Sequence, residues 1–129
     1  MRFMMMVKSN EQSEAGLPPS PEMMAAVGKY TEEMTKAGVV LETGGLLPSA
    51  MGSRIRLAGG KLIVSDGPFA EAKELIGGYA IIRAASKQEA IEHGKRFMTI
   101  HVDVLGPSYE SEMEIRQLAD FDPELAPER

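Results

Sequence analysis

Two carboxylates and a phenol fall within fourteen residues near the middle of the chain: Asp66, Glu71 and Tyr79. Asp66 follows an apolar segment and precedes Gly67-Pro68, a pair typical of a tight turn. A carboxylate with apolar neighbours has a raised pKa and can act as a general base, and a second carboxylate nearby can separate the two pKa values into an acid and a base. The Tyr79 hydroxyl can donate to a ligand. These three are the first candidate catalytic residues.

Each of the three also has a structural interpretation. The Asp66 carboxylate can accept backbone N–H bonds within its own turn, which would lower its pKa and prevent base catalysis at neutral pH. Glu71 can stabilise the start of a short helix. Tyr79 can pack in the core with its hydroxyl satisfied. A raised pKa of Asp66 would therefore indicate a general base, and a lowered pKa would indicate a turn residue.

Candidate substrate-binding residues surround these positions. Gly67, Pro68 and Phe69 form the turn, and Gly78 precedes the phenol, where a glycine lets a ligand approach the backbone. Arg54 and Arg56 alternate on one face of a predicted strand and can hold an anionic group. A solvated hairpin face is the alternative interpretation of the two arginines.

His101 is the histidine with the greater catalytic interest, because it lies between two apolar residues just after the predicted end of a helix and can pair with Asp103. His93 is expected on the polar side of that helix and exposed. The two histidines and scattered carboxylates show no metal-ligand spacing, and the chain has no Cys. We expect no metal and no cofactor.

The apolar patterns and turn signals predict a β-α-β unit, a β-hairpin and a second β-α-β unit. The expected elements are a strand at 3–7, a loop at 9–20, a helix from 20 to 38, a strand from 39, a hairpin at 54–64, a short helix at 70–76, a strand at 79–82, a helix opening on a capping box at 86–89, and a strand at 112–118. This order is that of a ferredoxin-like α+β fold with an inserted hairpin.

The first predicted strand, residues 3–7, is continuously apolar and does not alternate, so both of its faces should be covered. The two helices of a ferredoxin-like fold cover only one face of the sheet. We therefore expect a second copy of the chain on the open face, giving a homodimer built as a dimeric α+β barrel.

Composition narrows the class of protein. The 129 residues suit one domain, placed at 1–118, followed by a charged, Pro-containing tail at 119–129. A net charge of −5 without a basic cluster argues against nucleic-acid binding. No apolar run reaches the roughly 20 residues of a membrane span, and the apolar N-terminus is too short for a signal peptide. With zero Cys, we expect a cytoplasmic protein.

The segment from Asp66 to Tyr79, which opens with Asp66-Gly67-Pro68-Phe69, resembles the signature of the YCII-related domain family in its DGPF-motif subgroup. Further similar segments lie at 4–8, 13–16, 28–30 and 114–117, so the resemblance covers nearly the whole chain. One departure is Ala80, where the family often has a bulky aromatic residue. If that aromatic lines a pocket, the pocket of this chain is larger.

The resemblance implies a ferredoxin-like protomer and a dimeric α+β barrel. Some relatives act on small ring-cleavage products, muconolactone isomerase shares the general fold, and some members are encoded beside sigma factors or fused to them. The His–Asp pair of a related group does not transfer, because its histidine lies in an N-terminal region where this chain has none. Two alternative functions are therefore expected. The first is a cofactor-free isomerase or lyase whose small-molecule pocket lies between helices and sheet, with Asp66, Glu71 and Tyr79 at its mouth. The second is a non-catalytic ligand-binding or interaction domain linked to sigma-factor-type regulation.

Overall fold

The computed structural model describes residues 1–120, so the predicted tail lies outside the described residues from position 121 onward. Within these residues six strands and the two long helices follow the predicted order, and one short helix, α1, is added to them. They are β1 (Arg2–Lys8), α1 (Glu11–Glu14), α2 (Pro21–Lys36), β2 (Val40–Gly45), β3 (Ser53–Ala58), β4 (Lys61–Asp66), β5 (Ile76–Arg83), α3 (Lys87–Leu105) and β6 (Met113–Gln117), with 3-10 turns η1 (Ser49–Met51) and η2 (Ala72–Glu74).

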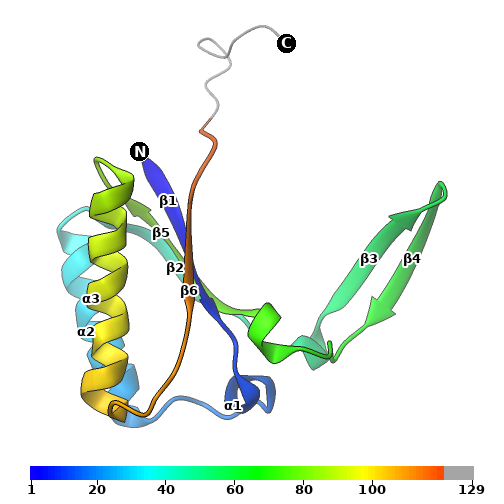
Figure 1. Cartoon of the computed structure of the whole chain (residues 1–129), viewed down its shortest axis with the longest axis horizontal. Helices are drawn as coiled ribbons and strands as arrows, with labels where there is room; N and C mark the ends of the chain where they lie inside the picture. Colours follow the sequence, from blue (N-terminus) through cyan, green and yellow to red (C-terminus); the bar gives the residue numbers. More distant parts are fainter. Residues whose placement is uncertain (121–129) are drawn as a thin grey trace, which may run out of the picture.

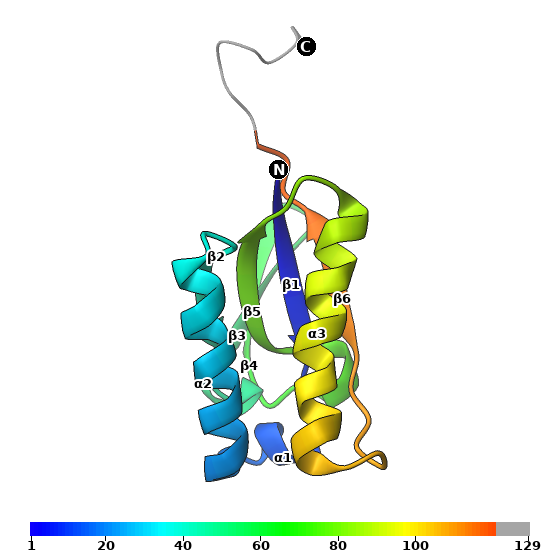
Figure 2. The ribbon, with the colours of Figure 1, turned by 90° about the vertical axis from the view of Figure 1, so that its left-hand side faces the viewer.

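The main sheet has the strand order β2-β5-β1-β6, and all neighbouring strands are antiparallel. In each β-α-β unit the two parallel strands are separated by a strand from the other unit, which confirms the predicted ferredoxin-like α+β topology. Helices α2 and α3 lie side by side on one face of this sheet, as Figure 2 shows. The other face carries no helix (Figure 1).

Helix α2 begins and ends where the sequence signals predict, and α3 begins where they predict. The Ser20 hydroxyl accepts the Met23 N–H at 3.2 Å, and Gly38 follows the end of α2 with φ of 77°. At α3 the Ser86 hydroxyl accepts the Glu89 N–H at 3.1 Å. The Glu89 carboxylate returns to the N–H of Ala85, not to that of Ser86, so the predicted capping box closes one residue early.

Two expectations about local structure are wrong. The loop predicted at 9–20 contains the one-turn helix α1, because the Asn10 side chain accepts the Ser13 N–H at 2.8 Å while the Ser13 hydroxyl accepts the Asn10 N–H. His101 lies inside α3 rather than after it, since the helix continues to Leu105. The helical stripe that carries Phe97 simply extends by another turn through His101.

The core lies between the sheet and the helices. Phe3 and Ile82 are 1% and 2% exposed and pack with Met5 and Ala90. Because side chains alternate along a strand, the residues that flank Met5 in β1 point to the open face of the sheet, where they are only half-buried. The continuous apolar run of β1 therefore serves two different surfaces, one of which has no cover within a single copy.

Candidate functional site

A cavity of about 990 Å³ separates the helix layer from the sheet. This volume is at the upper end of the roughly 300–1,000 Å³ of small-molecule pockets. Its walls are mostly apolar and come from β1, β2, β5 and β6 on one side and from α2 and α3 on the other. The apolar lining includes Met5, Val7, Met23, Val27, Ala80, Ile82, Phe97 and Met113.

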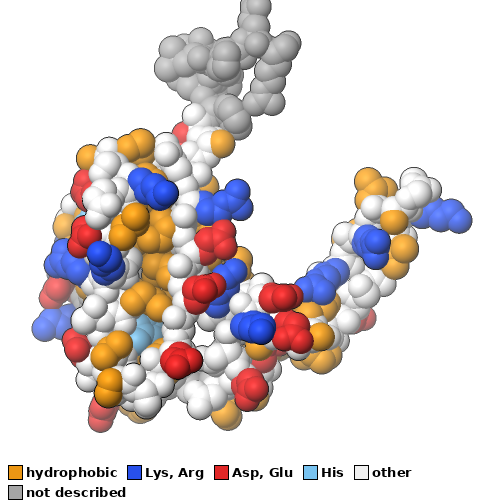
Figure 3. Space-filling view, in the orientation of Figure 1, with side chains coloured by type: hydrophobic (Ala, Val, Ile, Leu, Met, Phe, Trp, Pro, Cys, Tyr) orange, Lys and Arg blue, Asp and Glu red, His pale blue; other side chains and the backbone are white. Residues whose placement is uncertain are grey.

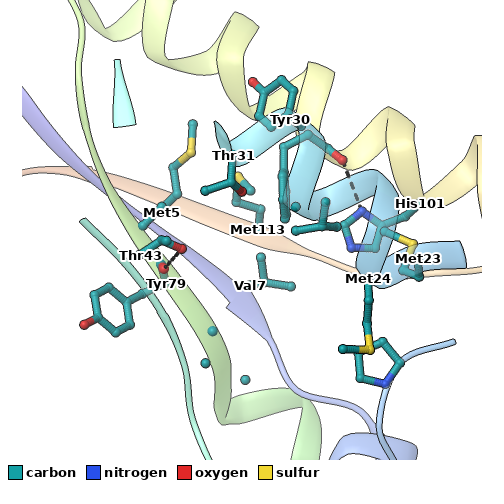
Figure 4. Close-up of a pocket in the computed structure, with 18 of the residues that line it drawn as sticks. Met5, Val7, Met23, Met24, Tyr30, Thr31, Thr43, Tyr79, His101 and Met113 are labelled. Carbon is teal, nitrogen blue, oxygen red and sulfur yellow. Dashed lines mark hydrogen bonds between the residues drawn. The ribbon is translucent and has the colours of Figure 1, made fainter. Parts of the chain in front are cut away.

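Ala80 lies on the helix-facing side of β5 and lines this cavity. This is the position at which the resemblance implies a bulky aromatic residue in many relatives and this chain has a small one. Four methionines, Met5, Met23, Met24 and Met113, also line the space, as Figure 4 shows. Their flexible thioether side chains can adjust to the shape of a bound ring and make favourable contacts with it.

A row of rings forms the α3 side of the cavity. His93, Phe97 and His101 follow at intervals of four residues, so they share one face of the helix. The rings of Phe97 and His101 meet edge to face with centroids 5.0 Å apart, and Tyr109 stacks on His101 at 5.9 Å. Tyr30 of α2 lies 6.0 Å from Phe97. An aromatic ligand would find several ring faces and edges here.

His101 provides the polar anchor of this row. Its Nδ1 lies 3.1 Å from the carbonyl oxygen of Phe97, drawn as a dashed line in Figure 4. A carbonyl oxygen only accepts, so Nδ1 donates and the neutral ring keeps its lone pair on Nε2. Within residues 1–120 no hydrogen-bond partner reaches Nε2. The ring therefore offers one free acceptor on the cavity side of α3.

His93 occupies a different environment from the exposed one expected. Its side chain is 13% exposed, and both ring nitrogens are buried without a hydrogen-bond partner among the described residues. The nearest acid is Glu89, with an oxygen 3.6 Å from Nε2. The expectation failed because α2 packs over this side of α3, where the Tyr30 hydroxyl donates to the His93 carbonyl oxygen at 3.3 Å.

Burial raises the pKa of the Tyr30 phenol above its ordinary value, while the positive charge of Arg96 opposes this shift. Tyr30 is therefore a neutral hydroxyl over the physiological range. Its hydrogen bond to the His93 carbonyl oxygen joins α2 to α3 beside Phe97.

The Asp66 turn lies away from this cavity. Asp66 is exposed, and its carboxylate accepts a hydrogen bond from the Ser53 hydroxyl at 2.7 Å, across the β3–β4 ladder. The bond goes neither to a ligand pocket nor to the N–H groups of its own turn. Glu71 is exposed as well, and it makes no side-chain cap at η2. The structure brings neither carboxylate to the cavity wall.

The rest of the turn packs against η1. Gly67 lies so close to Ser49 that a Cβ at Gly67 would be 1.8 Å from the Ser49 carbonyl oxygen. The Phe69 N–H donates to the Ser49 hydroxyl at 3.0 Å, and this hydroxyl in turn donates to the Glu14 carboxylate at 2.5 Å. Glu14 also accepts the Ser49 N–H at 2.9 Å. The motif thus joins α1, η1 and the start of the chain segment that leads to β5.

The remaining predicted substrate-binding residues divide between two places. Pro68 and Phe69 line a shallower hollow together with Glu14, and the Arg54 guanidinium lies 3.7 Å over the Phe69 ring. Gly78 and Tyr79 border the large cavity. In Figure 4 the Tyr79 ring points away from the other labelled side chains. Arg56 lies on the exposed hairpin and lines neither space.

Sequence reasoning missed most of the cavity lining. The spacing of His93, Phe97 and His101 at i, i+4 and i+8 was the available signal, and it was lost when the helix was ended before His101. Asn10, whose side-chain amide donates to the Tyr109 hydroxyl at 3.3 Å, carried no recognisable motif. Among the described residues there is no cluster of His, Asp or Glu that could hold a metal ion.

The fold and the cavity together define a small α+β domain of ferredoxin-like topology with a ligand-sized space between helices and sheet. The model of the YCII-related domain family matches residues 1–101, and the chain belongs to this family. It is also 33% identical over 102 residues to an uncharacterized protein of Rhizobium meliloti (strain 1021), across 79% of this chain and 74% of that protein. In the part of the chain that the structure describes, none of the helices has the length and apolarity needed to cross a membrane.

Proposed function

We propose that this protein binds a small, largely apolar, ring-containing molecule in the cavity between α2, α3 and the sheet. The observation that carries the proposal is a cavity of about 990 Å³ with mostly apolar walls and, on its α3 side, a free acceptor at the Nε2 of His101. Pockets for small molecules combine these two features, because apolar walls give affinity and a few polar groups fix orientation.

The shape of the lining indicates the ligand chemistry. On one side lies the aromatic row of α3, and on the other lie the methionines of β1 and β6. A flat ring inserted between them contacts ring edges and thioethers at once. A hydroxyl or N–H on that ring can donate to His101. The preferred ligand is therefore a neutral ring system with one hydrogen-bond donor.

Two related probes test this proposal. 2-Naphthol has a hydroxyl that naphthalene lacks, and a neutral hydrogen bond contributes roughly 0.5–1.5 kcal/mol, so 2-naphthol should bind about 2- to 12-fold more tightly. Fluorescence titration of both probes measures this ratio. In His101→Phe, which keeps a ring at the stack, the ratio should fall to about one. An unchanged ratio in that variant would exclude His101 as the anchor.

Ala80→Phe tests the position of the site. The added ring projects from β5 into the cavity, so the affinity for both probes should fall at least tenfold. The matched control is Ala25→Phe, which adds the same ring at an exposed position on α2 that does not line the cavity. Equal affinity in the wild type and Ala80→Phe would place binding elsewhere.

A cofactor-free isomerase or lyase is the second candidate. The observation that favours it is again the free Nε2 of His101, which can accept a proton from carbon in an apolar site. Asp66 and Glu71 do not line the cavity, so this candidate uses neither as a partner of His101 within one copy. Proton NMR of 2-tetralone in heavy water gives the test. Exchange of the protons beside the ketone should accelerate with the wild type and not with His101→Phe; no acceleration leaves binding as the function.

The proposal also includes the family subgroup, the cellular location, a regulatory link and the pairing of two copies. The Asp66-Gly67-Pro68-Phe69 sequence supports the DGPF subgroup, and the cysteine-free composition supports a cytoplasmic location. A link to sigma-factor-type regulation rests on the resemblance alone, and an absence of turnover would favour it. Pairing of two copies through the open sheet face is supported by Met4, Met6 and Ile81, which are half-buried there and form one apolar strip across β1 and β5.

A further inference from the structure

The part of the cavity lining next to α1 carries a group of polar side chains. The four residues that form it, called here the polar end, are Asn10, Ser13, His101 and Tyr109. Both histidines of the chain line the cavity, and Figure 3 shows histidine surface, in pale blue, beside hydrophobic side chains on the body of the molecule. Part of the lining can therefore be seen from outside. The proposed function uses one group of the polar end, the Nε2 of His101.

The Asn10 side chain sets the direction of the hydrogen bonds in the polar end. Asn10 is the N-cap of α1, and its side-chain oxygen lies 2.8 Å from the Ser13 N–H. A backbone N–H only donates, so the amide atom beside it must be Oδ1. The other amide atom is then Nδ2, which donates to the Tyr109 hydroxyl at 3.3 Å. The oxygen of Tyr109 is thus the acceptor in this bond.

The proton of the Tyr109 hydroxyl has no partner within the described part of the chain. A phenol has one O–H donor and can accept as well, so the bond from Asn10 uses only a lone pair. Within residues 1–120 this O–H donates to no acceptor. Because Tyr109 is half-buried and lines the cavity, its O–H can donate to a group inside the cavity.

This donor lies beside the acceptor of His101. The rings of His101 and Tyr109 are stacked, with an angle of 15° between their planes and centroids 5.9 Å apart. The Nδ1 of His101 is engaged by the Phe97 carbonyl oxygen at 3.1 Å, which leaves Nε2 as the acceptor. A ligand that carries only a donor would leave the Tyr109 O–H unpaired in a partly buried site, which costs affinity.

We infer that Tyr109 is a second anchor of the cavity, which donates a hydrogen bond to a carbonyl oxygen of the ligand, and that Asn10 keeps the phenol ready to do so. Because both anchors line the same cavity, the inference rests on the proposed function. It narrows the ligand to ring systems that carry a carbonyl oxygen as well as the donor for His101, such as hydroxy ketones. Two neighbouring polar contacts fix the orientation of such a ring in an otherwise apolar space.

A pair of probes isolates the second anchor. 2-Acetylnaphthalene has a carbonyl oxygen that 2-ethylnaphthalene lacks, and equilibrium dialysis measures the affinity ratio of the two. Tyr109→Phe keeps the stacked ring and removes the O–H, so the ratio of ketone to hydrocarbon affinity should fall about 2- to 12-fold. In His101→Phe the same ratio should change less than twofold, because the ketone gives His101 no donor.

Asn10→Asp tests the role of the amide and keeps the helix cap, since aspartate caps as well as asparagine does. One carboxylate oxygen accepts the Ser13 N–H, and the other accepts the Tyr109 O–H, which is then no longer offered to the ligand. The ketone ratio should again fall about 2- to 12-fold. Gln12→Glu is the matched control: it makes the same change from amide to acid in α1, at a residue that lines the cavity but does not bond to Tyr109, and should leave the ratio within twofold.

Naphthalene, which uses neither anchor, should bind both variants within twofold of the wild type, and this shows that the cavity is intact. Ketone ratios that stay unchanged in Tyr109→Phe and Asn10→Asp, in a protein whose preference for 2-naphthol depends on His101, would overturn the second anchor and leave the proposed function standing. If neither 2-naphthol nor the ketone binds the wild type saturably, the proposed function fails and the second anchor fails with it.

Discussion

Gly67→Ala is the most informative change in the Asp66 turn, because the structure gives its consequence directly. An ideal Cβ at Gly67 would lie 1.8 Å from the carbonyl oxygen of Ser49, 2.6 Å from the carbonyl carbon and 3.2 Å from the nitrogen of Ala50. Ordinary contact begins at 3.4 Å, so η1 and the turn must separate by about 1.6 Å. All three neighbours are backbone atoms, which cannot rotate out of the way.

The cost follows from what this separation breaks. Overpacking of this kind costs roughly 1–3 kcal/mol. The movement also stretches the bond from the Phe69 N–H to the Ser49 hydroxyl, which contributes about 0.5–1.5 kcal/mol. We expect a loss of about 2–4 kcal/mol in the local stability of the turn. The global free energy of unfolding should fall by less, because the turn can open while the sheet and the two long helices remain packed.

Amide hydrogen exchange at Ser49, Gly67 and Phe69 measures the local opening. A loss of 2–4 kcal/mol corresponds to exchange about 30- to 700-fold faster. Gly28→Ala is the matched control: it lies in α2 with nothing within 4 Å of the added methyl group, so it should stabilise the fold by roughly 0.5–1 kcal/mol and leave the three amides unchanged. If the three amides exchange in Gly67→Ala at rates within twofold of the wild type, the close packing of the Asp66 turn against η1 is refuted.

Three other changes have defined outcomes. Gly94→Ala should change the free energy of unfolding in urea by less than about 1 kcal/mol. The atoms nearest to the added methyl group belong to the movable side chains of Ile115 and Met113, and alanine has a higher helix propensity than glycine. A loss above about 2 kcal/mol would show that these side chains cannot move aside. Since burial raises the pKa of Tyr30 above 10.0, folding favours the protonated phenol, and the free energy of unfolding should fall as pH rises above about 10. Tyr30→Phe should reduce this dependence on pH, measured by urea titrations at several pH values. An equal dependence in the variant and the wild type would contradict the burial argument. Asp66→Asn should leave the affinity for 2-naphthol unchanged. A tenfold loss of affinity would show that the ligand binds at the Asp66 turn instead of in the cavity.

Local signals in the sequence predicted the elements well. Ser20-Pro21 and Gly38 marked both ends of α2 because capping chemistry acts within a few residues. The hairpin followed from alternation around Gly59-Gly60, and the order of elements then gave the ferredoxin-like topology. These inferences needed only short-range physics and a known pattern of connections.

The candidate site depended on contacts that sequence reasoning cannot reach. The partner of Asp66 is Ser53, thirteen residues earlier, and it is fixed by the register of β3 and β4. Glu14 and Ser49 are thirty-five residues apart and meet only because α1 and η1 pack together. His101 was misplaced because the β-branched residues after it have weak helix propensity, which tertiary packing overrides. The cavity itself is the space between residues of seven elements, and no single segment encodes it.

The methionine methyl signals of the protein test the central claim most directly. Of the four methionines that line the cavity, Met5, Met23 and Met113 are buried or half-buried and serve as the probes, whereas Met51 lies outside it, just before β3, and is 72% exposed. In carbon–proton correlation spectra recorded during titration with 2-naphthol, the three cavity methyl groups should shift saturably with one dissociation constant while Met51 stays in place. Saturable shifts at Met51 with none at the three cavity methionines would contradict the account, because the exposed segment before β3 would then be the binding surface.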